Sequence, residues 1–375
     1  MNLTENLANV LLNMIPEIGP IRANKLISYF GSATKIFQAD IEEIKNSAEI
    51  NDKIAEKILK SVNFLDVQGE FEKAKELGIK IVTINDKEYP LQLKTLNDPP
   101  IVLYIKGDIT EKDIYSIAIV GTRKPTEYGK TITEKLTKEL TELNITIVSG
   151  LARGIDTVAH KTAINFCGRT IAVLGNGLNV YYPSENHKLQ DAIANSGAVV
   201  SEFPLGVRPE KRNFPRRNRL ISALSLGTVV IESAEKSGAL ITAKYSAEQG
   251  KDVFAVPGSI LSKYSRGPHL LIKQGAKLIE KAQDVVEEIS ILAEWIKKKT
   301  QNINVAIKNN ENTKNELSNV EKKILDILKS FPQGLNIDIL HKKINQPFNI
   351  LSEGIVSLEL KGFVKSLPGK VYIGV

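Results

Sequence analysis

A short stretch of the sequence, residues 208–219, concentrates the residue types that bind a polyanion. Six cations and one carboxylate, Glu210, accompany a single aromatic residue, Phe214, so the stretch has a net charge of +5, against +7 for the whole chain. Cations neutralise phosphates and an exposed ring stacks on a base, as in proteins that bind single-stranded nucleic acid. The alternative is a solvated basic loop whose ring packs into the core. The cations are Arg208, Lys211, Arg212, Arg216, Arg217 and Arg219.

The segment Val120-Gly121-Thr122-Arg123 places another arginine directly after a predicted buried strand. A guanidinium at the carboxyl edge of a sheet is suited to a phosphate, because its planar donors match the phosphate oxygens. Several predicted strands end in small residues, which let backbone amides and helix N-termini approach an anion. We therefore expect an anion-binding rim with small residues at Gly121, Ser149-Gly150, Gly175 with Gly177, Ser233 and Ser237-Gly238.

An enzymatic site has little support in the sequence. Ser149, Asp156 and His160 are the residue types of a hydrolase triad, but the serine lacks the flanking glycine pattern of a nucleophile elbow. Asp156 and His160 lie one helical turn apart, so a helix cap or a local pair explains them equally well. We predict no catalytic residue and no enzyme activity.

Cofactor and metal sites are also weakly indicated. Gly175-Asn176-Gly177 could open a dinucleotide fingerprint, but Val180 occupies the position of the third glycine. The acid at the next strand end, Glu202, follows 27 residues after Gly175, whereas the fingerprint requires about 20. The single cysteine, Cys167, excludes an internal disulfide and a thiolate cluster for zinc, and the four histidines lie far apart. We predict no cofactor and no metal.

A scaffold for these residues is indicated by the pattern of residues 67–298. Short β-branched runs alternate with helical segments, as in an open, mostly parallel α/β sheet. Ligands of such sheets bind beyond the carboxyl ends of the strands, where the small residues lie. The predicted strands are IKIVTI, IVLYI, SIAIVG, ITIVSG, TIAVLG, AVVSE, TVVIES and DVFAVP.

The N-terminal region, residues 1–66, has short helical periods. Pro16 and Gly19 mark a tight turn between the first two helices, and Arg22 and Lys25 follow it. This pattern resembles a helix-hairpin-helix or SAM-like domain, whose turn amides can meet a DNA phosphate. A small helical interaction module is an equally good interpretation.

The C-terminal region divides into a linker and a small domain. Residues 299–317 are rich in Asn and Lys and predict a mobile linker. Residues 318–375 show three helical periods followed by a two-stranded hairpin, the pattern of a winged helix. The third helix, about Pro347 to Leu360, contains Glu353 and Glu359 but no Arg or Lys. We therefore expect this helix to contact protein rather than to read DNA.

Length and hydrophobicity limit the class of protein. A chain of 375 residues suggests two or three domains. The N-terminal residues include acidic Glu5 instead of a basic signal-peptide region, and no apolar run approaches the roughly twenty residues of a membrane span. The sequence predicts a cytoplasmic protein without a membrane segment.

A series of motifs between about Tyr89 and Ala276 closely resembles, in order and spacing, the bacterial DNA processing protein A family, DprA, also called Smf. The outer regions resemble that family's variable additions, an N-terminal helical domain and a C-terminal winged helix. The motifs are YPLQL, DPPIVLYIKG, IAIVGTRKPTEYG, SGLARGIDTVAH, TIAVLGNGLNVYYP, SEFPLG, NFPRRNRLIS, ESAEKSGALITA, EQGKDVFAVPG and LIKQGA.

The resemblance implies an extended Rossmann-like domain that binds single-stranded DNA without known catalysis. It also implies protection of incoming strands in natural transformation, loading of the RecA recombinase, and a homodimer. The alternative is a nucleotide-processing enzyme of phosphoribohydrolase type, recognised by a Pro-Gly-Gly-x-Gly-Thr-x-x-Glu loop. Its nearest counterpart here, Pro257-Gly258-Ser259-Ile260, has neither the second glycine nor the acid.

Residue roles follow from the same resemblance. Arg123, Lys211 and Arg217 would neutralise phosphates and Phe214 would stack on a base, while Asn218 would bond a base edge or fix its loop. Lys188 and Arg216 have no role that the motif fixes, and Arg208 and Arg212 would supply only long-range attraction. The implied DNA-binding set is Gly121, Thr122, Arg123, Ser149, Gly150, Arg153, Lys211, Phe214, Arg217, Asn218, Arg219, Ser237 and Gly238.

Overall fold

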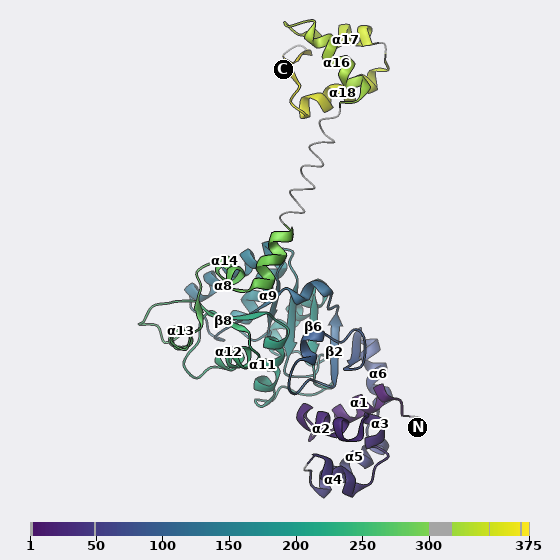
Figure 1. Cartoon of the computed structure of the whole chain (residues 1–375), viewed down its shortest axis with the longest axis vertical. Coiled ribbons are helices and arrows are strands. Elements are labelled where there is room, and N and C mark those ends of the chain that lie inside the picture. Colours follow the sequence, from purple (N-terminus) through teal and green to yellow (C-terminus); the bar gives the residue numbers. More distant parts are fainter. Residues whose placement is uncertain (1–2, 49, 300–316, 345, 368–369, 375) are drawn as a thin grey trace. The chain divides into compact units, whose positions relative to one another are not determined.

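The computed structural model describes residues 3–48, 50–299, 317–344, 346–367 and 370–374. The chain forms two compact units, Met1–Ala293 and Glu294–Val375, and Figure 1 shows the elements of each. No helix among the described residues is both long and apolar enough to cross a membrane.

The first unit begins with six helices. Thr4 starts the first of them, because its side chain accepts a hydrogen bond from the amide of Leu7. Pro20 occupies the first turn of the second, and Gly31, with φ of 79°, ends it in the left-handed conformation that glycine tolerates. The helices are α1 (Glu5–Met14), α2 (Pro20–Phe30), α3 (Ala33–Ile36), α4 (Ile41–Ala48), α5 (Asp52–Phe64) and α6 (Val67–Glu76).

Nine strands of the described residues form one sheet in the order β1-β2-β6-β5-β4-β3-β7-β8-β9. β2 runs antiparallel to β1 and to β6, and the other neighbours are parallel. The predicted mostly parallel α/β sheet is therefore confirmed, with all eight predicted strands in it. The strands are β1 (Ile79–Thr83), β2 (Val102–Gly107), β3 (Ser116–Val120), β4 (Thr146–Ser149), β5 (Thr170–Leu174), β6 (Ala198–Ser201), β7 (Gly227–Val230), β8 (Asp252–Ala255) and β9 (Lys277–Leu278).

Every residue of β3, β4 and β5 is buried, because helices cover both faces of a parallel sheet. The ninth strand, β9, was not predicted, because its two residues are both exposed and are too few to show the alternation of a strand. The remaining helices of the unit are α7 (Leu91–Lys94), η1 (Glu111–Ile114), α8 (Glu127–Glu142), α9 (Ile155–Asn165), η2 (Ser184–Asn186), α10 (His187–Ser196), α11 (Asn213–Ala223), α12 (Gly238–Glu248), α13 (Arg266–Lys273) and α14 (Ala282–Glu288).

The order of the strands creates a switch point. From β3 the chain moves through β4 and β5 to β6, and it then returns through α11 to β7, on the other side of β3. The crossovers that follow the neighbouring strands β3 and β7 run in opposite directions, which opens a crevice beyond the carboxyl ends of these strands. The fold therefore places α11, with most of the basic stretch, over that crevice.

The N-terminal helices share a hydrophobic core with the sheet. Val10 of α1 and Leu26 of α2 belong to the same buried cluster as Tyr104 of β2 and Val199 of β6, and Figure 1 shows these helices at the end of the sheet that contains β2. Both regions thus lie within one compact unit. A domain boundary at residue 66 stays a prediction.

The second unit contains the helices and the hairpin that the sequence predicts. Its core includes Ile324, Leu340, Leu351 and Leu358. A short strand, β10, joins the hairpin to make a three-stranded antiparallel sheet. Membership of the winged-helix class stays a prediction, and most of the predicted linker, residues 300–316, lies outside the described residues. The elements are α16 (Asn319–Lys329), β10 (Leu335–Asn336), α17 (Ile337–Ile344), α18 (Phe348–Leu360), β11 (Val364–Leu367) and β12 (Val371–Gly374).

Candidate nucleic-acid interface

A cavity of about 600 Å³ lies at the switch point. It is bounded by the end of β3, the loop after β4, one side of α11 and the start of α12. A smaller hollow adjoins it, with Arg123, Tyr182, Phe214 and Arg217 lining both. Most of the predicted site residues meet here, although they come from four separate stretches of sequence. Those lining one or both hollows are Gly121, Thr122, Arg123, Gly150, Arg153, Lys211, Phe214, Arg217, Asn218, Ser237 and Gly238.

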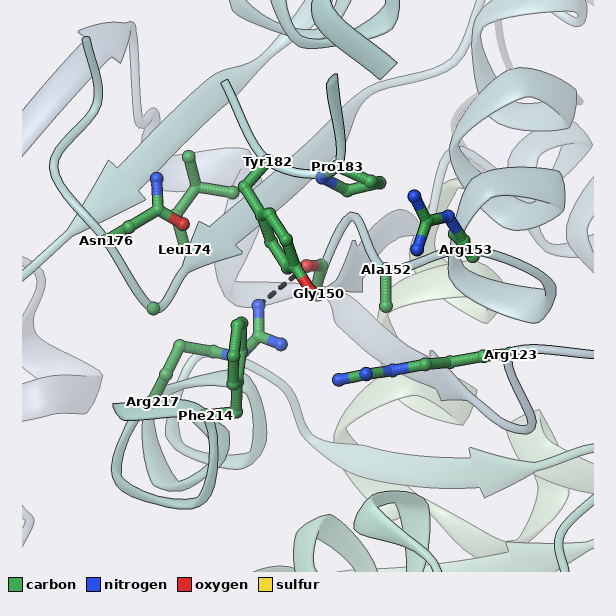
Figure 2. A pocket seen from close by; sticks show the side chains of 11 residues that line it. Arg123, Gly150, Ala152, Arg153, Leu174, Asn176, Tyr182, Pro183, Phe214 and Arg217 are labelled. Atoms are coloured by element: carbon green, nitrogen blue, oxygen red, sulfur yellow. Dashed lines mark hydrogen bonds between the residues drawn. The ribbon is translucent and has the colours of Figure 1, made fainter. Parts of the chain in front are cut away.

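Phe214 is partly exposed and sits among cations and a second ring. Figure 2 shows its ring below Tyr182, with the extended side chain of Arg123 pointing toward it. The ring centroids of Tyr182 and Phe214 lie 5.6 Å apart with planes inclined by 37°. The Cζ atoms of Arg123 and Arg217 lie 5.5 and 6.0 Å from the Phe214 centroid. A partly exposed ring held among guanidinium groups can receive a base and its phosphate together.

Arg217 is buried at the base of the cavity and holds the neighbouring backbone in place. It is 4% exposed, and its guanidinium donates to the carbonyl of Gly150 at 2.6 Å and to that of Val173. A Cβ added at Gly150 would lie 2.6 Å from this guanidinium, so a larger residue there would displace it. Burial lowers the pKa of Arg217 to about 10, against the opposing effect of Asp156. Arg217 therefore stays charged at neutral pH while it joins α11 to the ends of β4 and β5.

Exposed cations surround the cavity. Arg123 follows β3, Lys211 precedes α11, and all three of Arg123, Lys211 and Lys236 are exposed and line the cavity. Long exposed cations at the mouth of a cavity attract a polyanion and neutralise its phosphates. The predicted site did not include Lys236, which lies within the motif ESAEKSGALITA. It also did not include Tyr182, which lies in the Tyr-Tyr-Pro end of TIAVLGNGLNVYYP. The second aromatic ring of that motif was the sequence signal that pointed to Tyr182.

Asn218 and Ser237 organise the junction of α11 and α12. The Asn218 side-chain amide donates to the carbonyl of Gly238 at 3.1 Å, and the Ser237 hydroxyl accepts from the amide of Ala239. Of the two roles considered for Asn218, the observed bond corresponds to fixing the loop. Its carbonyl oxygen meanwhile accepts from Arg217 at 3.1 Å.

Two predicted site residues lie elsewhere. Arg219 is 3% exposed and pairs with Glu202 at 2.6 Å and with Asp98 at 3.2 Å, on the side of α11 away from the cavity. Ser149 is fully buried and donates to the carbonyl of Ile119 at 2.6 Å. Neither side chain lines either hollow. The helical period of α11 and the pleat of β4 turn both side chains inward, away from the cavity, and their assignment to DNA binding stays a prediction.

The other cations of the basic stretch also differ in surroundings. Arg216 pairs with Glu202 at 3.0 Å and covers the ring of Phe203. Arg212 is exposed and pairs with Glu210 at 2.7 Å. Arg208 and Lys188 are exposed and line neither hollow.

The hydrolase triad is not assembled. His160 is fully buried and bonds the Thr170 hydroxyl through Nδ1 at 2.7 Å. That hydroxyl donates to the carbonyl of Ile147, so it accepts from His160, which fixes the Nδ1-protonated tautomer. Asp156 accepts from the amides of Gly150 and Ala152 at 3.1 and 3.3 Å. Burial raises the pKa of Asp156 and lowers that of His160 to about 3. These groups hold loops in place.

The geometry also disfavours the nucleotide sites considered from sequence. After Gly175-Asn176-Gly177 the next α-helix starts only at His187, so its N-terminus does not follow the glycines as a dinucleotide site requires. The segment Pro257-Gly258-Ser259-Ile260 lines neither hollow, and Ile260 is 85% exposed. Among the described residues, no group of three or more His, Cys, Asp or Glu is arranged to hold a metal ion.

The motif series of the sheet domain matches a known family. Residues 80–290, more than half of the chain, match the family model described as DNA recombination-mediator protein A. The chain belongs to this family. The resemblance drawn from the motifs is thereby confirmed, and it places the cavity within the part of the chain that the recombination-mediator family shares.

Curated relatives agree with the family model. DNA processing protein DprA of Bacillus subtilis (strain 168) is 49% identical over 216 residues, which cover 57% of this chain and 73% of that protein. Protein Smf of Escherichia coli (strain K12) is 37% identical over 298 residues, covering 77% of this chain and 76% of that protein.

Two solved structures of DNA processing protein A share the fold. DNA processing protein A from Streptococcus pneumoniae superposes with a TM-score of 0.68 at 36% identity, over 77% of this chain and 99% of that one. DNA processing protein A from Helicobacter pylori, whose structure concerns its single-stranded DNA binding mode, gives a TM-score of 0.51 at 32% identity, over 58% of this chain and 97% of that one.

Proposed function

We propose that this protein binds single-stranded DNA in the cavity at the switch point and delivers that DNA to the RecA recombinase. The observation that carries the proposal is the ring of Phe214, partly exposed in the cavity and bordered by the guanidinium groups of Arg123 and Arg217. A base stacks on the ring, and Arg123, Lys211 and Lys236 neutralise phosphates on either side. The relative from Helicobacter pylori, which has a single-stranded DNA binding mode, supports this assignment.

The experiment measures binding of a fluorescent oligothymidylate by wild type and by Phe214→Leu at two salt concentrations. We expect the substitution to weaken binding by about 1–3 kcal/mol, because one stacked base is lost, and to leave the salt dependence unchanged. Phe166→Leu is the matched control, since Phe166 is 45% exposed at the end of α9 and lines neither hollow. Equal affinities for both variants and wild type would refute the cavity as the DNA site.

Arg123→Ala tests the electrostatic part of the same proposal. Loss of one phosphate contact is expected to lower the slope of log affinity against log salt by about 0.7, the value for single strands. Arg123→Ala with an unchanged slope would assign Arg123 to a role other than phosphate neutralisation.

Delivery to the recombinase is the finer part of the proposal. Incoming strands in natural transformation are protected by the bound protein and then coated by RecA. With DNA first covered by a single-strand-binding protein, we expect wild type to shorten the lag before RecA hydrolyses ATP. Phe214→Leu, which binds DNA poorly, is expected to leave the lag long. An equal lag with and without wild type would remove the RecA step from the proposal.

We further propose that the protein acts as a non-enzymatic homodimer in the cytoplasm. Light scattering at micromolar concentration is expected to give twice the mass of one chain. Incubation with nucleoside monophosphates is expected to release no free base. Base release would instead favour the phosphoribohydrolase interpretation.

A further inference from the structure

We propose that the DNA strand extends from the cavity onto the exposed face of α2, where Arg22, Lys25 and Tyr29 form a second contact surface. This α2 surface deepens the proposed function and depends on it. Nothing in the family description or in the named relatives assigns it.

The turn between α1 and α2 adjoins the helix that carries Phe214. A Cβ added at Gly19 would lie 3.7 Å from Nη1 of Arg216, two residues after Phe214 in α11. The side-chain amide of Asn13, near the end of α1, donates to the carbonyl of Glu202 at 3.1 Å. Since the shared hydrophobic core also joins these helices to the sheet, the turn has a fixed position beside α11.

The exposed residues of α2 are of the kinds that line the cavity. Pro20, Ala23 and Leu26 face the core, which turns the opposite side of the helix to solvent. There Arg22 and Lys25 are exposed, one helical turn apart, and Tyr29 follows one turn later with 60% of its surface exposed. Two cations and a ring along one helix face can bind two phosphates and a base.

Charge favours DNA as the occupant of the α2 surface. α2 contains no carboxylate, and the nearby Glu17 in the preceding turn is neutralised by Lys57. The guanidinium of Arg22 donates to the carbonyl of Glu17 at 2.9 Å, which holds it at the turn that meets Arg216. Between the cavity and the turn lies the basic stretch 208–219. Within this stretch Lys211 lines the cavity and Arg216, although paired with Glu202, adjoins the turn, so the stretch connects the two surfaces.

The dimensions suit a strand of moderate length. The 11 residues of α2 span roughly 16 Å, at 1.5 Å per residue. Single-strand sites of one domain occupy about 4–16 nucleotides, so a helix face of this length is small enough to form part of such a site. A protein ligand would use exposed Ile21 and Tyr29 instead and would not require the cations.

The test compares a short oligothymidylate of about six nucleotides, which fills the cavity, with one of about twenty, which reaches both surfaces. The variant is Arg22→Glu with Lys25→Glu. Its affinity for the long strand is expected to fall about tenfold and its salt slope by about 1.4, because two phosphate contacts are lost. Affinity for the short strand is expected to stay unchanged. Tyr29→Ala should weaken only the long strand, without a change of slope.

The matched control is Lys35→Glu with Lys73→Glu, which changes the net charge equally at exposed positions of α3 and α6. Equal long-strand affinity of the two double variants would overturn the α2 surface and leave a protein ligand as its occupant. Equal losses for short and long strands would also overturn it, because α2 would then act through the cavity. Phe214→Leu separates the hypotheses: if it weakens neither strand, the proposed function itself fails.

Discussion

The two sides of α11 contain the same residue types and use them differently. On one side Phe214, Arg217 and Asn218 line the cavity, at helical positions i, i+3 and i+4. On the other, Arg219 pairs with Glu202, whose carboxylate is 1% exposed, and Arg216 pairs with it from the side. The first side is open to a ligand, whereas the second is closed by its own counter-ions.

Local charge therefore does not specify what an arginine does. Arg217 and Arg219 are both buried and only two residues apart, yet one borders the cavity and the other lies in an ion-paired network. The helical period turns them to opposite sides, and the neighbours on each side decide the role. Stability and DNA affinity should therefore respond separately to substitutions on the two sides.

The largest expected effect is on the buried side. Arg219→Met leaves the buried carboxylate of Glu202 without its closest cation, so we expect the free energy of unfolding to fall by about 3–5 kcal/mol. Urea denaturation measures this loss. Arg212→Met, at an exposed ion pair, should change stability by less than about 0.5 kcal/mol. If Arg219→Met instead weakened DNA binding in a fully stable protein, the division between the two sides would be wrong.

The second largest expected effect is a loss of folding stability in acid, through the buried His160. His160 has a folded pKa of about 3, lowered by burial and by Arg217, against about 6.5 when unfolded. Because the unfolded chain binds the extra proton between these values, stability falls as pH falls through this window, by up to about 1.4 kcal/mol per unit. His160→Met should reduce that slope in urea titrations at several pH values. An unchanged slope would show that His160 binds the same number of protons in the folded and unfolded states, against the prediction.

Arg217→Lys is expected to affect both stability and DNA binding, because Arg217 is buried and bonded to the ends of β4 and β5 and also lines the cavity. Lysine keeps the charge but not the planar donors that hold Gly150 and Val173. We expect a loss of about 1–3 kcal/mol in unfolding free energy together with several-fold weaker binding of single-stranded DNA. Denaturation and fluorescence anisotropy measure the two. A change in stability alone would make Arg217 a purely structural residue, and a change in DNA affinity alone would make it purely a binding residue.

The smallest expected effect lies at the mouth of the cavity. Lys211→Gln should leave stability unchanged, since this side chain is exposed, and should reduce the salt slope of DNA binding by about 0.7. Arg208→Gln is the matched control, an exposed cation of the same stretch outside both hollows. Equal slopes for the two variants would mean that the loop acts only through its total charge.

The order of strands and helices was predictable because buried parallel strands leave continuous β-branched runs. The same regularity indicated the rim, since Gly121, Gly150 and Gly238 follow strands or begin helices at one edge of the sheet. Tyr182 and Lys236 are among the cavity residues that were missed. They lie outside the basic stretch in sequence, and only the return of α11 across β3 brings them to the same cavity as Phe214.

By itself the sequence determined the α/β sheet, the family, and the concentration of cations and one ring in residues 208–219, because these depend on local period, spacing and composition. The tertiary structure decided which of those cations are available. Arg219 is enclosed by Glu202 and Asp98, which come from distant loops, and Ser149 is enclosed by the neighbouring strand. Burial and counter-ions depend on packing between remote segments, so they appear only when the chain is folded.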